Sequence, residues 1–146
     1  HRLALVRIAV DNNFKLRASN IEFDLPQPSY TIHTLAALSE KHPDHDFTII
    51  MGEDNLNTLP KWKNYDQILE HYSILVYPRV ESDENLSVIS GDRSDLLDHP
   101  KVTMVDAPLM KISASFIRKA VHDGNDVRYL LTEPVLKYVD EMNFYR

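Results

Sequence analysis

The sequence predicts an α/β fold with a doubly wound parallel sheet, and three features of the chain lead to that prediction. Continuous apolar runs of strand length occur at residues 47–51, 73–77 and 102–105, as expected for strands that are buried on both faces of a sheet. Segments with the apolar spacing of helices alternate with these runs. Parallel neighbours need crossover segments of this kind, so the alternation indicates parallel strands with helices packed against them.

Composition limits the classes of protein to which the chain can belong. Its 146 residues, 43% hydrophobic and 26% charged, fit one globular domain spanning residues 1–146. The formal net charge of −6 argues against a nucleic-acid surface, which needs a basic stripe. The chain has no cysteine and no apolar run of membrane-span length, so we expect a cytoplasmic protein without disulfides or a membrane partner. Its glycines, at 52, 91 and 124, exclude a Walker loop and a GxGxxG turn.

The first third of the chain is expected to begin with a helix. Apolar spacing predicts it over residues 2–10, with neither an initiator methionine nor a cap before it, so we expect the natural N-terminus to be missing. Alternation of apolar and polar residues over 14–23 predicts one or two short strands. A further helix is predicted to begin with Ser29 or Thr31 as its cap and to end before Pro43.

The rest of the chain continues the alternation of strands and helices. After the strand at 47–51 the sequence predicts a short helical piece at 56–59 ended by Pro60, a helix at 65–72 and the strand at 73–77 ended by Pro78. A mobile loop around a weak helix is predicted in 81–100, before the strand at 102–105. The last two elements are a helix from Ser113 to Gly124 and a helix at 134–142 with Pro134 at its first position. These boundaries depend on prolines, glycines and capping hydroxyls, because such residues begin or interrupt regular structure.

The stretch from Ile112 to Arg118 is the main candidate site. Ser113 is placed to accept a hydrogen bond from a free backbone N–H and so to cap a helix. On that helix Ser115 and Arg118 share one face, and a helix N-terminus that carries hydroxyls and a guanidinium suits a phosphate chain. The alternative, an ordinary capped amphipathic helix with a solvated basic face, stays open.

Further candidates follow predicted strands, where ligands bind in open parallel sheets. Gly52 permits a close approach of the backbone to a ligand, and Asp54 is placed either to accept hydrogen bonds from ribose hydroxyls or to cap the next helix. Arg79 is either a phosphate ligand or an ordinary surface arginine. Trp62, the only tryptophan, offers a flat face for stacking an aromatic ring, or else it packs at the edge of the core.

Several of these stretches match motifs of one known family in order and spacing, over essentially the whole chain. Residues 28–35 (PSYTIHTL) are similar to its PSYTxxTL, 49–56 (IIMGEDNL) to IIGxDxL, 76–79 (VYPR) to its VxxR strand end, and 112–118 (ISASFIR) to ISxTxIR. Trp62 is similar in place to the family's tryptophan. The chain therefore resembles the bacterial nicotinate mononucleotide adenylyltransferase family. Ser115 replaces a threonine and keeps the hydroxyl, whereas the H-x-G-H motif and the glycine-rich turn before it are absent.

The resemblance implies a Rossmann-like nucleotidyltransferase fold of the H-x-G-H superfamily, without its first strand and helix in this chain. It implies adenylyl transfer from ATP to nicotinate mononucleotide, which gives deamido-NAD and pyrophosphate, with Mg²⁺ on the phosphates. The mononucleotide phosphate would attack the α-phosphorus in line, without a covalent enzyme intermediate. The chain by itself is expected to be inactive and to hold no catalytic residue, because the histidines that stabilise the transferring phosphate lie outside it.

The binding residues of the family carry over to matching positions of this sequence. For ATP the resemblance implies contacts from Gly52, Asp54, Arg79, Ser113, Ser115 and Arg118. For the mononucleotide it implies that Trp62 stacks on the pyridine ring and that the backbone N–H groups of Thr31 and Lys63 receive the carboxylate. The implied partners are these two nucleotides, with no nucleic acid, no membrane and no protein-bound metal site, and a homo-oligomer is left open.

Two alternative functions stay open. Phosphopantetheine adenylyltransferase shares a stretch similar to 112–118, but Trp62 and residues 29–35 speak against it. The other is a nucleotide-binding module without catalytic activity, since the chain lacks H-x-G-H. The residues that precede His1 in the natural protein would separate the enzyme from such a module. The sequence also leaves open the selectivity between nicotinate and nicotinamide.

Overall fold

A computed structural model of the chain describes residues 1–78, 92–109 and 112–146. The chain divides into two compact units. Residues 1–20 and 112–146 form the terminal unit, and residues 21–111 form the sheet unit. The single domain predicted over residues 1–146 stays a prediction, because contacts within each unit do not test it.

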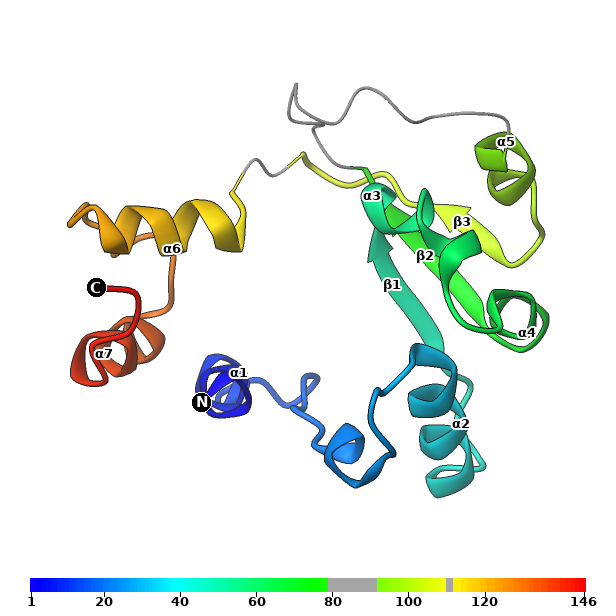
Figure 1. Cartoon of the computed structure of the whole chain (residues 1–146), viewed down its shortest axis with the longest axis horizontal. Coiled ribbons are helices and arrows are strands. Elements are labelled where there is room, and N and C mark those ends of the chain that lie inside the picture. The colour runs from blue at the N-terminus through cyan, green and yellow to red at the C-terminus, as the bar shows by residue number, and fades with distance from the viewer. Residues whose placement is uncertain (79–91, 110–111) are drawn as a thin grey trace. The chain divides into compact units, whose positions relative to one another are not determined.

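The sheet unit is built on parallel strands in the order β1–β2–β3 (Figure 1). The strands are β1 (Thr48–Gly52), β2 (Ser73–Tyr77) and β3 (Val102–Met104). Ile49 lies opposite Ile74, which lies opposite Val102. Helix α4 (Tyr65–His71) lies in the crossover from β1 to β2, and helix α5 (Asp92–Leu97) in the crossover from β2 to β3. The predicted strands and the predicted helix at 65–72 are confirmed.

One face of this sheet carries the hydrophobic core. Met51, Ile74 and Val76 are buried on it. Helices α2 (Thr31–Lys41) and α4 supply the buried residues Ile32, Leu35, Ile68 and Leu69. Leu56 and Leu59, from the segment that follows β1, are fully buried, so each stabilises the fold by about 1.5–3 kcal/mol. The core therefore fixes both the helix before β1 and the segment after it.

The opposite face of the sheet is less covered than the sequence predicts. Side chains alternate along a strand, so Ile50 points away from its buried neighbour Met51. Ile50 is 71% exposed. The expected burial of this strand on both faces is therefore wrong within the sheet unit. An apolar run indicates a strand, but it does not show whether a helix covers each face.

Two short helical segments follow β1 and carry the chain past the carboxyl ends of the strands (Figure 1). Helix α3 (Glu53–Leu56) has Gly52 as its N-cap residue, and a 3₁₀ helix, η2 (Leu59–Lys61), comes after it. The helical piece predicted over 56–59 and ended by Pro60 is therefore wrong. Pro60 lies in the first turn of η2, where its missing N–H and fixed φ are no disadvantage. This proline begins a turn and does not end one.

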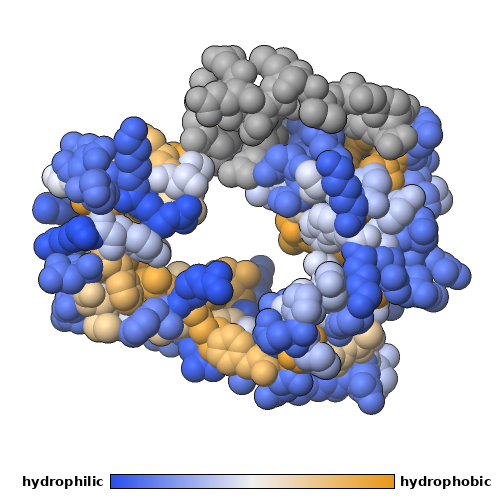
Figure 2. All heavy atoms as spheres, in the orientation of Figure 1, coloured by the Kyte–Doolittle hydropathy of each residue, from blue (hydrophilic) through white to orange (hydrophobic). Residues whose placement is uncertain are grey.

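The strands predicted over 14–23 are also wrong. Residues 14–20 form no strand, and Ile21–Asp24 form a 3₁₀ helix, η1. Phe14 is 89% exposed and Phe23 is 72% exposed, and hydrophobic atoms lie at the surface over the segment between α1 and α2 (Figure 2). Alternation alone does not make a strand, because a strand also needs a neighbour that accepts its backbone hydrogen bonds.

Helix α2 begins without the predicted side-chain cap. Its N-cap residue is Tyr30, which is extended, and no side chain accepts a hydrogen bond from the first turn. The cap predicted from Ser29 or Thr31 is wrong, because Ser29 precedes the N-cap residue and Thr31 is already helical. The predicted end of the helix before Pro43 is confirmed, since α2 ends at Lys41.

The terminal unit holds helices α1 (Arg2–Val10), α6 (Ala114–His122) and α7 (Glu133–Glu141). They confirm the predicted helices at 2–10, from Ser113 to Gly124, and at 134–142, although α7 begins one residue earlier and has Pro134 within its first turn. Helix α1 packs against α7. The buried residues of this unit are Ala120, Val127, Val135 and Val139. Gly124 ends α6 with φ +74°, a left-handed conformation that favours glycine.

Part of the predicted loop in 81–100 lies outside the described residues, which leave out 79–91. Helix α5 confirms the helix that the sequence predicts within this range. Over the described ranges, no helix has the length and apolar character needed to cross a bilayer.

Candidate functional site

The predicted site residues are distributed over both units. The sheet unit contains Thr31, Gly52, Asp54, Trp62 and Lys63, and the terminal unit contains Ser113, Ser115 and Arg118. Arg79 falls outside the described residues. The structure therefore presents the predicted residues as two groups, one on each unit.

The first turn of α2 presents backbone N–H groups without partners. The carbonyl oxygen of Tyr30 accepts hydrogen bonds from the N–H groups of His33, at 2.9 Å, and Thr34, at 3.2 Å. Within the described part of the chain, the N–H groups of Thr31 and Ile32 donate to no other group. The positive end of the helix dipole lies at the same turn. This turn can therefore receive an anionic or carbonyl oxygen.

Trp62 and Lys63 lie in the loop between η2 and α4. The backbone N–H of Trp62 donates to the carbonyl oxygen of Leu59 at 2.9 Å and closes η2. The indole is half-buried and packs against the core. The predicted packing at the edge of the core is therefore confirmed, while stacking on an aromatic ligand stays a prediction.

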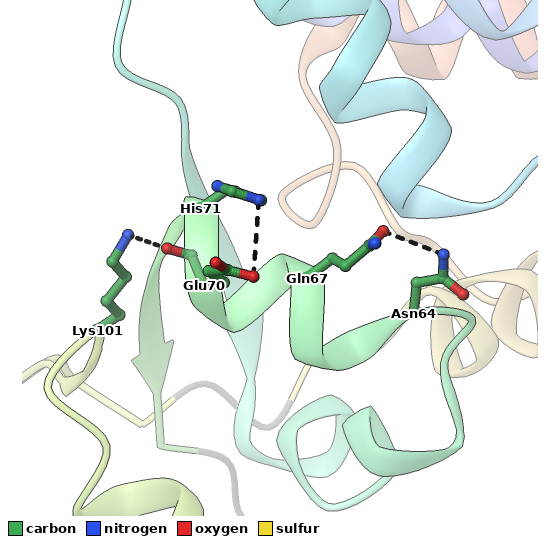
Figure 3. Close-up of polar contacts among 5 residues, drawn as sticks. All are labelled: Asn64, Gln67, Glu70, His71 and Lys101. Atoms are coloured by element: carbon green, nitrogen blue, oxygen red, sulfur yellow. Dashed lines mark hydrogen bonds and ion pairs between the residues drawn. The ribbon is translucent and has the colours of Figure 1, made fainter.

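Helix α4, which follows this loop, has polar side-chain contacts at both ends (Figure 3). At its start Asn64 Nδ2 donates to Gln67 Oε1 at 3.1 Å. In its last turn the backbone oxygen of Glu70 accepts a hydrogen bond from Lys101 Nζ at 2.6 Å, and His71 Nε2 lies 3.8 Å from Glu70 Oε2. Because Lys101 directly precedes β3, its hydrogen bond to the Glu70 backbone ties the last turn of α4 to the sheet.

The Lys63 side chain reaches back to the start of α2. Its Nζ lies 4.4 Å from the centroid of the Tyr30 ring, which is a cation–π contact. The Tyr30 ring also meets the His33 ring edge-on, with 5.6 Å between centroids. Tyr30 is not among the residues predicted from the sequence, although it directly precedes Thr31. The contact joins the Trp62 loop to the first turn of α2.

Gly52 stands where β1 becomes α3, and it is buried. A Cβ at this position would collide with Asp54 Oδ1 and lie 3.3 Å from the Tyr77 ring. Any larger residue would therefore have to displace that carboxylate and would crowd that ring. Helix α3 has no side-chain cap, so the alternative that Asp54 caps it is wrong. Tyr77, opposite Gly52 in the register, is a further neighbour that the sequence did not predict.

The predicted residues of the sheet unit are anchored by one hydrophobic core. Each lies within a few residues of a fully or nearly fully buried side chain. These buried neighbours are Ile32, Met51, Leu56 and Leu59. Because protein cores are close-packed, these buried neighbours fix the backbone at the predicted residues.

The start of α6 is the corresponding feature of the terminal unit. Ser113 Oγ accepts a hydrogen bond from the N–H of Phe116 at 3.1 Å, which confirms the predicted cap. Arg118 Nη2 donates to Ser115 Oγ at 3.0 Å, and both side chains are exposed. The turn thus presents hydroxyls, a guanidinium and the positive end of the helix dipole. An ordinary capped amphipathic helix, the alternative interpretation, would have the same geometry. The start of α6 therefore fits both a phosphate site and a solvated helix.

Other features of the structure do not overlap with these residues. A hollow of about 550 Å³ lies beside α4 and α5, lined in part by Tyr65, Leu69, Leu96 and His99, and none of the predicted site residues that the structure describes lines it. Across the described residues, no group of three or more His, Asp or Glu side chains is placed to hold a metal ion. The two groups mainly supply hydrogen-bond donors and cations, which suit anionic ligands.

Known proteins with related sequences give the chain its family. The model of the cytidylyltransferase-like family matches residues 1–120. A probable nicotinate-nucleotide adenylyltransferase of Flavobacterium johnsoniae is 48% identical over 145 residues, which cover 99% of this chain and 72% of the relative. The protein of the same name from Christiangramia forsetii is 48% identical over 147 residues, which cover 100% of this chain and 72% of the relative.

A solved structure supports the fold. Plasmodium falciparum nicotinic acid mononucleotide adenylyltransferase complexed with APC matches with a TM-score of 0.73 at 19% identity, covering 99% of this chain and 74% of that one. The predicted α/β class, with a Rossmann-like parallel sheet, is confirmed. The 48% identity over nearly the whole chain and the match to the family model show that the chain belongs to the nicotinate-nucleotide adenylyltransferase family of the cytidylyltransferase-like proteins.

Proposed function

We propose that the protein transfers the adenylyl group of ATP to nicotinate mononucleotide and releases deamido-NAD and pyrophosphate. The observation that carries the proposal is 48% identity, over 99% of the chain, to a relative named for this activity. A phosphate oxygen of the mononucleotide bonds to the α-phosphorus of ATP, and the bond from that phosphorus to the oxygen of the leaving pyrophosphate breaks. The protein positions the two phosphates and balances their charge, because no covalent intermediate is needed.

The sheet unit holds the pyridine end of the mononucleotide in this proposal. The free N–H of Thr31, at the positive end of α2, and the backbone N–H of Lys63 donate to the nicotinate carboxylate. The exposed part of the Trp62 ring stacks on the pyridine. The uncapped turn and the half-buried indole support these roles, since both leave binding capacity unused within the described residues.

For ATP, the proposal assigns Gly52 and Asp54 of the sheet unit and the predicted residues of the terminal unit. Gly52 lets the adenosine approach the backbone at the end of β1, and Asp54 accepts hydrogen bonds from the ribose hydroxyls. Ser113, Ser115 and Arg118 bind the triphosphate at the start of α6. The hydrogen bond between Arg118 and Ser115 supports this role, because it already orders the guanidinium on the exposed face. Arg79, outside the described residues, adds a phosphate contact by resemblance to the family.

Mg²⁺ enters the reaction with ATP, as part of the substrate. In phosphoryl-transfer sites this ion is held mainly by phosphate and water oxygens, with one or two carboxylates. The predicted residues offer one carboxylate, that of Asp54, so they fit an ion held by the phosphates and not an all-protein cage. When bound, the ion neutralises charge on the transferring phosphates.

ATP and nicotinate mononucleotide are the proposed partners, and the cytoplasm is the proposed location. The absence of cysteine suits a reducing compartment.

Acceptor competition in full-length protein tests the proposal. With Mg²⁺ and ATP, nicotinate mononucleotide should give pyrophosphate and deamido-NAD with a much higher kcat/KM than pantetheine phosphate gives pyrophosphate. Equal or greater turnover of pantetheine phosphate would reject the assignment in favour of the rival enzyme. ATP binding without turnover of either acceptor would favour the nucleotide-binding module.

A further inference from the structure

The Lys63 side chain places a positive charge beside the first turn of α2. Its Nζ lies 4.4 Å from the Tyr30 ring centroid, and Tyr30 is the N-cap residue of α2. Among the described residues, no carboxylate forms a salt bridge with Lys63. An aromatic face attracts a cation without neutralising its charge. The ammonium group therefore remains available to an anionic ligand.

The Tyr30 ring and the Lys63 backbone, which the Lys63 side chain connects, each have further contacts. The Tyr30 ring is supported by His33, which meets it edge-on within the first turn of α2. On the other side, Lys63 is followed by Asn64, whose φ of 54° is left-handed and whose side chain bonds to Gln67 in α4. The Lys63 side chain thus spans from the start of α4 to the start of α2.

A charge at this place distinguishes an acid from an amide. The N–H groups of Thr31 and Lys63 can donate to a carboxylate oxygen or to a carboxamide oxygen, because both are acceptors. An ammonium group attracts the ionised carboxylate much more strongly than the neutral amide. We propose that the Lys63 ammonium makes the site select a pyridine mononucleotide with a carboxylate over one with a carboxamide, with Tyr30 as its positioning residue. This inference rests on the proposed function and names the group that sets its selectivity.

Lys63→Gln removes the charge and keeps a polar side chain. In full-length protein, kcat/KM for nicotinate mononucleotide should fall about fivefold, the upper range for an exposed charge pair, while kcat/KM for nicotinamide mononucleotide stays unchanged. Lys63→Arg should keep the wild-type ratio of the two values. Added salt should lower the wild-type ratio towards that of Lys63→Gln, because salt screens exposed charges.

Lys61→Gln is the matched control. Lys61 is an exposed lysine two positions away, and its side chain forms no hydrogen bond, salt bridge or cation–π contact within the described residues. It should leave the ratio at the wild-type value. A fall equal to that of Lys63→Gln would overturn the inference, because the selectivity would then come from the general field of the loop.

Variants of Tyr30 test its positioning role through the same ratio. Tyr30→Leu removes the ring that holds the ammonium group and should lower the ratio of the two kcat/KM values. Tyr30→Phe keeps the ring and should keep the ratio. If Tyr30→Leu lowers both values by one factor, Tyr30 does not position Lys63 for selectivity, and that part of the inference is wrong.

The remaining outcomes separate this inference from the proposed function. If Lys63→Gln lowers kcat/KM for both mononucleotides equally, or leaves both unchanged, the inference is overturned and the proposed function stands. If wild-type protein makes a dinucleotide from neither mononucleotide, the proposed function fails and the selectivity inference fails with it.

Discussion

The starts of helices α2 and α6 are both proposed to face anions, yet they are built differently. At α6 the Ser113 side chain accepts a hydrogen bond from the first turn. At α2 the N-cap residue is Tyr30, and no side chain caps the turn. The cation of α6 comes from the same helix, as Arg118, whereas that of α2 comes from the loop before α4, as Lys63.

The difference shows which observation supports a ligand at each place. A capped start such as α6 is complete without a ligand, so the cap itself says nothing about binding. At α6 the prediction of a ligand therefore depends on the guanidinium of Arg118. An uncapped start such as α2 leaves donors that only water or a ligand can satisfy, so its free N–H groups carry the prediction. Each variant below removes the feature that supports binding at one of the two starts.

The largest effect is expected at α6. Arg118→Ala removes the guanidinium that we place on the triphosphate, and hydrogen bonds to charged groups contribute about 1.5–3 kcal/mol. We expect kcat/KM for ATP to fall roughly 10- to 150-fold. The melting temperature should stay unchanged because the side chain is exposed. Steady-state kinetics with ATP varied, together with thermal unfolding, measure both quantities.

Lys119→Ala is the control for this variant. Lys119 is an exposed cation on the same helix, and its side chain forms no hydrogen bond or salt bridge among the described residues. Its removal should change kcat/KM for ATP by no more than about twofold, as expected for a surface charge. Equal effects of the two substitutions would leave α6 as an ordinary capped amphipathic helix.

A smaller effect is expected near α2. Trp62→Ala removes the proposed stacking face, and stacking of a base on an aromatic side chain contributes about 1–3 kcal/mol. The KM for nicotinate mononucleotide should rise about tenfold, with the KM for ATP unchanged. Trp62→Phe retains an aromatic face and should recover most of the loss. An unchanged KM in Trp62→Ala would assign the indole to the core edge alone.

Local signals account for what the sequence predicts correctly about the fold. The run at 73–77 is apolar and is ended by Pro78, and it forms β2 as predicted. Ser113 precedes an amphipathic segment and caps α6 as predicted. Residues 14–23 and Ile50 were not predictable in this way, because pairing and burial depend on which distant segments lie beside them.

The same distinction between local signals and distant contacts applies to the candidate site. The residue types at Thr31, Gly52, Trp62 and Ser113 stand out in the sequence, and the structure places each at a helix start, a strand end or a loop. Tyr30 was not predicted, because its contact with Lys63 joins segments that only folding brings together. The cation beside α2 is therefore visible only in the folded chain.

The smallest expected effect is on the free energy of unfolding, measured for one substitution at each of the two helix starts. Ser113→Ala removes a formed cap and should lower the free energy of unfolding by about 1 kcal/mol. Thr31→Ala removes a side chain that caps nothing and should change it by less than about 0.5 kcal/mol. Chemical denaturation of the two full-length variants measures the difference. Equal losses would mean that Thr31 does cap α2, and the free N–H groups would then no longer support a carboxylate site at that turn.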